Sequence, residues 1–129
     1  MKLKMIIAVG AALLASTSAF ADHHMAKAIK KSDVKGAAAF TTAKGMTLYT
    51  FDKDVANKSN CYGKCAKNWP PMAATANSKD DGDFTVLMRT DGTYQWAYKG
   101  HPLYTWIKDS KPGDNTGDGI KGVWHTARP

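Results

Sequence analysis

KGMTLYTFDKD at residues 44–54 recurs as KGHPLYTWIKD at residues 99–109, which places Tyr49 of the first copy in register with Tyr104 of the second. The same offset, carried on without a gap, still matches Trp69 with Trp124. A register that survives this far indicates an internal duplication rather than a chance similarity. The chain is therefore expected to fold as two similar units.

Strand-forming runs and glycine turns alternate around the duplicated segments. The runs are rich in Thr, Val, Leu, Phe and Tyr and predict strands at residues 38–43, 46–51, 84–89, 94–98 and 103–106. Lys44-Gly45, Asp91-Gly92 and Lys99-Gly100 separate them, and glycine at positive φ suits the tight turns of hairpins. Aromatic rings alternate along 94–98, which predicts one buried strand face. The pattern predicts a mainly β fold, an antiparallel sheet domain made of two pseudo-repeats.

A short helix is expected in the first unit. It covers residues 60–69, because Pro70-Pro71 cannot continue a helix. Ser59 or Asn60 would serve as its N-cap.

Cys61 and Cys65 are the only cysteines of the chain. Residues four apart on a helix share a face, with Cα atoms about 6 Å apart, so a disulfide that clips the short helix is expected. A redox-active pair is the rival interpretation. The C-x-x-x-C spacing differs from the thioredoxin C-x-x-C and no βαβ pattern accompanies it, which favours a structural disulfide.

Residues 1–21 have the organisation of a secretory signal peptide. Lys2 and Lys4 precede an apolar run, and Ala19-x-Ala21 fits a signal-peptidase site. The run is shorter than the roughly 20 residues that span a bilayer, and no cysteine follows that could carry a lipid. Neither a transmembrane span nor a lipid anchor is expected. The mature chain should start at Asp22 and work in the periplasm or outside the cell.

The mature chain is expected to contain one domain. Residues 22–36 are polar and lysine-rich and predict a flexible arm, and residues 37–129 predict a single β-rich domain. Within this domain, repeat 1 covers about 38–71 and repeat 2 about 84–126, with a connector at 72–83.

The formal net charge of the chain is +7 and most of its cations are lysines, since Arg89 and Arg128 are the only arginines. Phosphate and base recognition favour the planar guanidinium group, and export removes nucleic acid as an ordinary partner. No nucleic acid partner is expected. The sequence names no other partner, and a monomer is expected.

The residues that recur in both units are interpreted as structural. They are Tyr49, Phe51, Asp54 and Trp69 in the first unit and Tyr104, Trp106, Asp109 and Trp124 in the second. The aromatic residues are expected to anchor the core, and the two aspartates to accept backbone N–H bonds in the turn of their own unit rather than to form a catalytic carboxylate pair. No Ser-His-Asp arrangement, Cys-His arrangement or phosphate-binding loop is found, so no enzyme is expected.

The motif Y-x-[FWY]-x-x-D fits both 49–54 and 104–109. Together with Cys61-x-x-x-Cys65, Trp69-Pro70-Pro71 and Gly100-His101-Pro102-Leu103-Tyr104, it resembles the pattern of the bacterial secreted-repeat proteins. Many of these look like lipoproteins, whereas this sequence lacks a lipid-accepting cysteine after the signal. The resemblance implies an exported location and a repeat architecture, and it implies no activity.

Two functions follow from these observations. The first is an exported, non-catalytic binding module of unknown ligand that needs no cofactor. The alternative is a periplasmic copper-binding or redox accessory protein that uses Asp22, His23 and His24. If cleavage leaves Asp22 first, its amine, two main-chain nitrogens and the His24 imidazole provide the square-planar nitrogen set that Cu(II) favours.

The copper hypothesis predicts that the mature protein binds Cu(II) through its free N-terminus. One extra residue before Asp22 moves His24 from third to fourth place and should weaken the affinity, as measured by calorimetry. Equal affinities of the two forms would discard the hypothesis.

Overall fold

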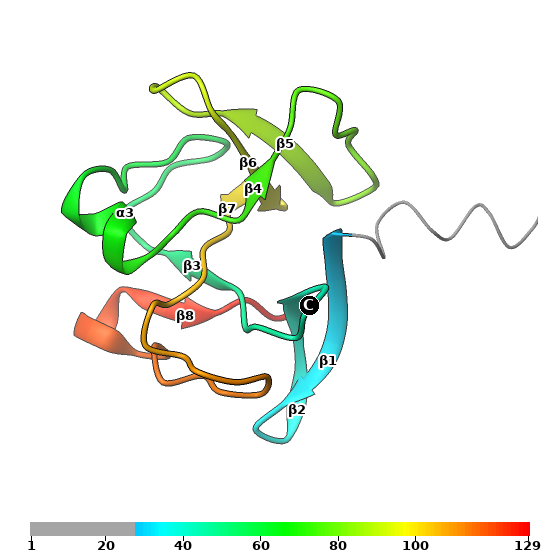
Figure 1. The fold of residues 1–129 in the computed structure, drawn as a ribbon, viewed down its shortest axis with the longest axis vertical. Helices are drawn as coiled ribbons and strands as arrows, with labels where there is room; N and C mark the ends of the chain where they lie inside the picture. The colour runs from blue at the N-terminus through cyan, green and yellow to red at the C-terminus, as the bar shows by residue number, and fades with distance from the viewer. Residues whose placement is uncertain (1–27) are drawn as a thin grey trace, which may run out of the picture.

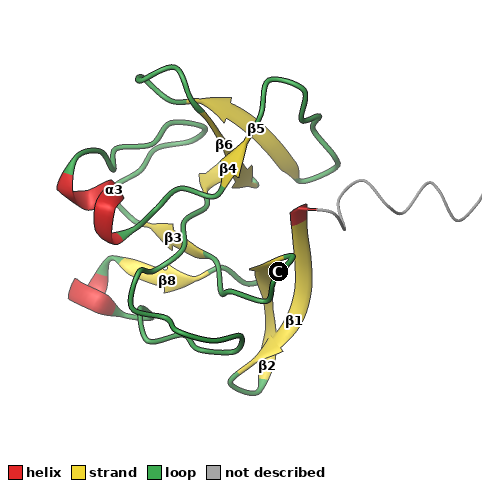
Figure 2. Cartoon of the chain, in the orientation of Figure 1, coloured by secondary structure: helices red, strands yellow, loops and turns green. Residues whose placement is uncertain are grey.

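The computed structural model describes residues 28–129, which form short strands, a short α-helix and a 3₁₀ turn (Figures 1 and 2). The elements are β1 (Ile29–Val34), β2 (Ala37–Thr42), β3 (Tyr49–Phe51), α3 (Lys64–Asn68), β4 (Ala73–Ala74), β5 (Phe84–Met88), β6 (Tyr94–Tyr98), β7 (His101–Pro102), η1 (Ile120–Gly122) and β8 (Trp124–Thr126). The predicted mainly β class with a short disulfide-clipped helix is confirmed.

The strands form small antiparallel sheets. β1 pairs with β2, β3 pairs with β8, and β6 lies between β4 and β5 and also pairs with β7. Figure 1 shows the β4–β6–β5 sheet at the top, the β3–β8 pair in the middle and the β1–β2 hairpin at the lower right.

The two repeats are interlaced at the centre of the molecule. β3 of the first repeat pairs with β8 of the second, with Tyr49 opposite Thr126. In the equivalent contact Tyr104 of the second repeat lies opposite Pro71 of the first. Pro71 and Thr126 occupy equivalent positions under the duplication, just as Tyr49 and Tyr104 do, so the two pairings are related by a local twofold axis. Neither repeat completes its sheet alone.

The structure differs from the flexible arm expected over 22–36, because Ile29–Val34 form β1. Ile29 and Val34 are each 1% exposed, and Ile29 joins the core against Phe40 and Leu48. Arg128 near the C-terminus donates hydrogen bonds to the carbonyl oxygens of the same hairpin. Burial of this apolar surface outweighs the high polarity of the segment.

The connector expected at 72–83 also differs in part, since Ala73–Ala74 form β4 and Met72 packs against the core. The Met72 N–H donates to the Leu103 carbonyl, and the Trp96 N–H donates to the Met72 carbonyl. With these pairings β6 is hydrogen-bonded along both edges, and Gln95 is fully buried whereas its neighbour Tyr94 is only half-buried. The expectation of one buried face for 94–98 was therefore too narrow.

The helix is shorter than the predicted 60–69 and begins only after Gly63, which has a φ of 60°. The predicted N-caps are wrong because both side chains are engaged elsewhere. Ser59 Oγ contacts the Tyr104 hydroxyl, and Asn60 Nδ2 donates to the Lys53 carbonyl. No helix within residues 28–129 has the length and apolar character needed to cross a bilayer.

The role of β1 predicts that Ile29→Ala lowers the free energy of unfolding by about 2–5 kcal/mol, because it removes buried methyl groups from the core. Urea denaturation of the mature protein measures this loss. Lys31→Ala on the same strand is the control, since its side chain is exposed and should change stability by less than about 0.5 kcal/mol. An arm that does not contribute to folding would make both variants neutral.

Candidate functional site

Tyr49 and Tyr104 face each other on the local twofold axis, and both are fully buried. The Tyr49 N–H donates to the Tyr104 carbonyl at 2.8 Å, and the Tyr104 N–H donates to the Tyr49 carbonyl at 3.0 Å. The buried N–H and C=O groups of the two tyrosines thus hydrogen-bond to each other at the point where the repeats meet.

Each tyrosine hydroxyl donates to the aspartate of the other repeat. Tyr49 bonds to Asp109 Oδ2 and Tyr104 bonds to Asp54 Oδ2, both at 2.6 Å. The remaining oxygen of each aspartate accepts a backbone N–H from the loop of its own repeat, from Asn60 for Asp54 and from Thr116 for Asp109. The carboxylates therefore serve their own turns and also tie the two repeats together, and the second role was not foreseen from the sequence.

Burial shifts the pKa of Tyr49, Tyr104 and Asp54. It raises the pKa of the Tyr49 and Tyr104 hydroxyls well above the ordinary value, and the neighbouring carboxylates raise it further. Burial also raises the pKa of Asp54, although the hydrogen bond from Tyr104 opposes this shift. Both tyrosines remain proton donors at neutral pH and do not act as phenolate nucleophiles.

Arg89 is a buried cation to which the sequence alone assigned no role. Its side chain donates to Ser59 Oγ, to Gln95 Oε1 and to the Cys61 carbonyl, and its guanidinium lies 4.2 Å from the centre of the Tyr62 ring. Ser59 in turn contacts the Tyr104 hydroxyl, so hydrogen bonds connect the guanidinium to Asp54. The sequence signal for this site was an arginine in a lysine-rich chain, because the planar guanidinium group holds five N–H donors in a fixed geometry that suits several acceptors at once.

The shared motif positions of the two repeats build one stack of aromatic rings, which we call the aromatic ladder: Phe51, Trp124, Trp69 and Trp106. Trp69 and Trp124 form its centre, with ring centroids 3.8 Å apart and planes inclined by 2°. Phe51 stacks on Trp124 and Trp106 stacks on Trp69, each at 4.1 Å. The order alternates between the repeats, so the ladder exists only when both are present.

The buried tyrosines support the ladder from its sides. Tyr49 meets Trp69 edge to face at 5.3 Å, and Tyr104 meets Trp124 in the same way at 5.2 Å. Gly117 packs directly against the ladder, so closely that a Cβ atom at this position would lie 2.7 Å from Trp69 Cη2. A glycine is required at 117 because any side chain would displace the stacked rings.

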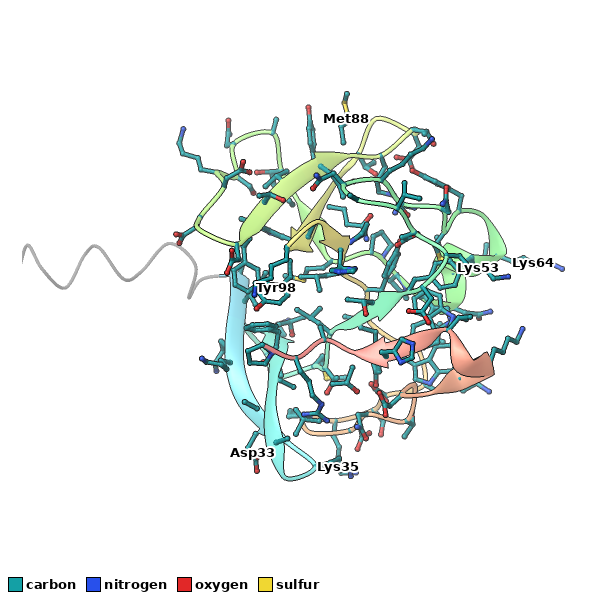
Figure 3. All side chains as sticks on the ribbon, turned by 180° about the vertical axis from the view of Figure 1, so that it is seen from behind. Asp33, Lys35, Lys53, Lys64, Met88 and Tyr98 are labelled. Atoms are coloured by element: carbon teal, nitrogen blue, oxygen red, sulfur yellow. A yellow bond between two sulfur atoms is a disulfide. The ribbon has the colours of Figure 1, made fainter. Side chains whose placement is uncertain are left out.

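A groove of about 420 Å³ runs along the ladder between α3 and η1, the two helical segments at the left of Figure 2. Its lining consists of Phe51, Lys53, Lys64, Cys65, Asn68, Trp69, Trp106, Ile120, Lys121, Val123 and Trp124. Figure 3 shows Lys53 and Lys64 close together at the edge of the molecule opposite β1.

The groove lies across the local twofold axis. Most of its lining positions occur as pairs that are equivalent in the two repeats: Phe51 with Trp106, Cys65 with Ile120, Asn68 with Val123, and Trp69 with Trp124. Phe51, Trp69, Trp106 and Trp124 were predicted from the sequence as structural residues only. The structure adds that the four side chains share one concave surface.

The disulfide between Cys61 and Cys65 is present, with Cα atoms 5.2 Å apart. Only Cys65 belongs to α3; Cys61 precedes the helix and is fully buried. The bond therefore clips the turn that leads into the helix, and it holds Cys65 on the groove lining.

The proposed copper ligands Asp22, His23 and His24 lie outside the described residues. Within residues 28–129 no three or more His, Cys, Asp or Glu side chains are grouped so that they could hold a metal ion. His125 Nε2 lies 2.8 Å from Asp52 Oδ2, within hydrogen-bond distance.

The duplication, the motif aspartates and the interlaced tyrosines define a domain of two repeats. A family model described as a secreted repeat of unknown function matches residues 32–73 and 85–128, and the chain belongs to this family. The match agrees with the resemblance noted from the motifs and supports an exported location. No curated protein and no solved structure matches the chain.

The reciprocal hydrogen bonds predict that Tyr49→Phe and Tyr104→Phe each lower the free energy of unfolding by about 1.5–3 kcal/mol, because a partly or fully buried carboxylate loses its donor. Chemical denaturation measures both effects. Tyr94→Phe on β6 is the matched control, since Tyr94 lies outside the Tyr–Asp network. If both motif variants changed stability by less than about 0.5 kcal/mol, the range of an ordinary surface substitution, the role assigned to these bonds would be contradicted.

Proposed function

We propose that the chain is an exported, non-catalytic binding module and that its ligand site is the groove over the aromatic ladder. One observation carries the proposal: stacked aromatic side chains from both repeats line one cavity of about 420 Å³. Small-molecule sites commonly have volumes of about 300–1,000 Å³ and are lined mainly by apolar and aromatic groups.

The lining supports binding rather than catalysis. Its titratable side chains are lysines, and its cysteine is held in a disulfide. The motif tyrosines and aspartates are not part of the lining, and each is held by hydrogen bonds that the fold requires.

The walls of the groove are fixed before any ligand arrives. The indoles of Trp69 and Trp124 are 5% and 3% exposed and are stacked on both sides, so they have no alternative rotamers available. Gly117 packs against one side of the ladder, and the disulfide fixes the start of α3 at the rim. A preformed site loses little conformational entropy when a ligand binds.

The proposed function includes a location outside the cytoplasm. Residues 1–21 act as the cleaved signal peptide, and the mature chain works in the periplasm or beyond it. The disulfide supports this location, since such bonds persist in oxidising compartments.

The proposal predicts that a neutral planar probe enters the groove. Naphthalene-2-sulfonamide should shift the indole N–H signals of Trp69, Trp106 and Trp124 in a ¹H–¹⁵N correlation spectrum. Trp96 provides an internal control, because it belongs to the other core cluster. Its signal should not move.

A variant that fills the groove tests whether the probe binds there. Asn68→Phe places a ring in the groove at an exposed position and should abolish the shifts. Lys67→Phe is the matched control, since Lys67 is an exposed neighbour on α3 outside the lining. Shifts that persist in Asn68→Phe, or the absence of shifts at millimolar probe in the unmodified protein, would overturn the proposed function.

A further inference from the structure

The groove is positively charged. Lys53, Lys64 and Lys121 lie on its lining and no carboxylate does. All three lysines are exposed, and none of them forms an ion pair with another residue of 28–129. Their charges are free to interact with an anion at the groove.

Two of these lysines occupy positions at which the repeats differ. Lys64 corresponds to Gly119 in the second repeat, and Lys121 corresponds to Ala66 in the first. The aromatic floor is shared by both repeats, whereas each of these two charges belongs to one repeat alone. The charges of Lys64 and Lys121 are thus not a by-product of the duplication.

The floor of the groove favours an aromatic ring. Trp69 has Trp106 on one face and Trp124 on the other, and Trp124 lies between Trp69 and Phe51. These two indoles can therefore present only their edges to the groove. Ring edges carry partial positive charge, and they attract the π-face of another ring in a T-shaped contact.

We infer that the ligand of the groove is a small aromatic anion, with a planar apolar body against the ladder and a carboxylate, sulfonate or phosphate group near the lysines. This inference rests on the proposed function and adds the chemical class of the ligand. A neutral ring satisfies the floor but leaves the lysines without a counter-charge. An aliphatic anion satisfies the lysines but has no π-face for the ring edges.

Naphthalene-2-sulfonate and naphthalene-2-sulfonamide test the inference, because they share one ring system and differ in charge. The anion should bind about 10-fold more tightly at low ionic strength, and its advantage should shrink toward 1 M salt, where charges are screened over about 3 Å. Calorimetry gives both dissociation constants, and the indole signals show that both probes occupy the groove.

Two variants that each lose three positive charges show whether the preference for the sulfonate comes from the groove lysines. The test variant replaces all three groove lysines with glutamine and should bring the affinity for the sulfonate down to that for the sulfonamide. The control variant makes the same change at exposed lysines outside the lining, namely Lys31, Lys44 and Lys79, and should keep most of the preference.

Other outcomes separate the two proposals. Equal binding of both probes in the groove overturns the aromatic-anion inference and leaves the proposed function standing. An advantage of the sulfonate that is the same in both variants shows long-range attraction only, and also overturns the inference. If neither probe shifts the indole signals, the proposed function fails and the inference fails with it.

Discussion

The contact between Tyr49 and Tyr104 is the constraint on which the rest of the structure depends. Their backbones bond to each other on the twofold axis, and each hydroxyl crosses to the aspartate of the other repeat. Each aspartate in turn closes a loop of its own repeat through a backbone N–H. One buried hydrogen-bond network therefore sets the register between the repeats and the shape of both loops. Such a network leaves little freedom, because any slip leaves a buried polar group unpaired.

The position of the aromatic ladder follows from this network. Fixing Tyr49 beside Tyr104 aligns β3 with β8 and brings Trp124 next to Phe51. The equivalent pairing brings Trp69 next to Trp106, and the two tryptophans then meet face to face on the axis. The groove is consequently a product of the interlacing. Its floor would not exist in a single repeat, because the stacked rings come alternately from the two repeats.

Much of the fold could be predicted from local patterns. Thr42 bonds to Met46 across the Lys44-Gly45 turn, and the 84–89 and 94–98 runs pair as β5 and β6. β1 could not be predicted, because Ile29 and Val34 enclose a polar stretch whose spacing does not match the two-residue period of a strand. The ladder could not be predicted either. Its contacts join residues of different repeats, far apart in the chain, and nothing in the local sequence indicates that each tyrosine strand pairs with the other repeat.

The divergence of the repeats gives the groove a direction. A groove formed by two identical repeats would offer a ligand two equivalent orientations related by the twofold axis. Here the first repeat closes its loop with a disulfide and α3, and the second closes it with Gly117 and η1. Lys64 and Lys121 stand on these two different segments without an equivalent lysine in the other repeat. The floor has therefore kept the symmetry that holds the fold together, while the rim has lost it, and an anionic group bound there would distinguish one orientation from the other.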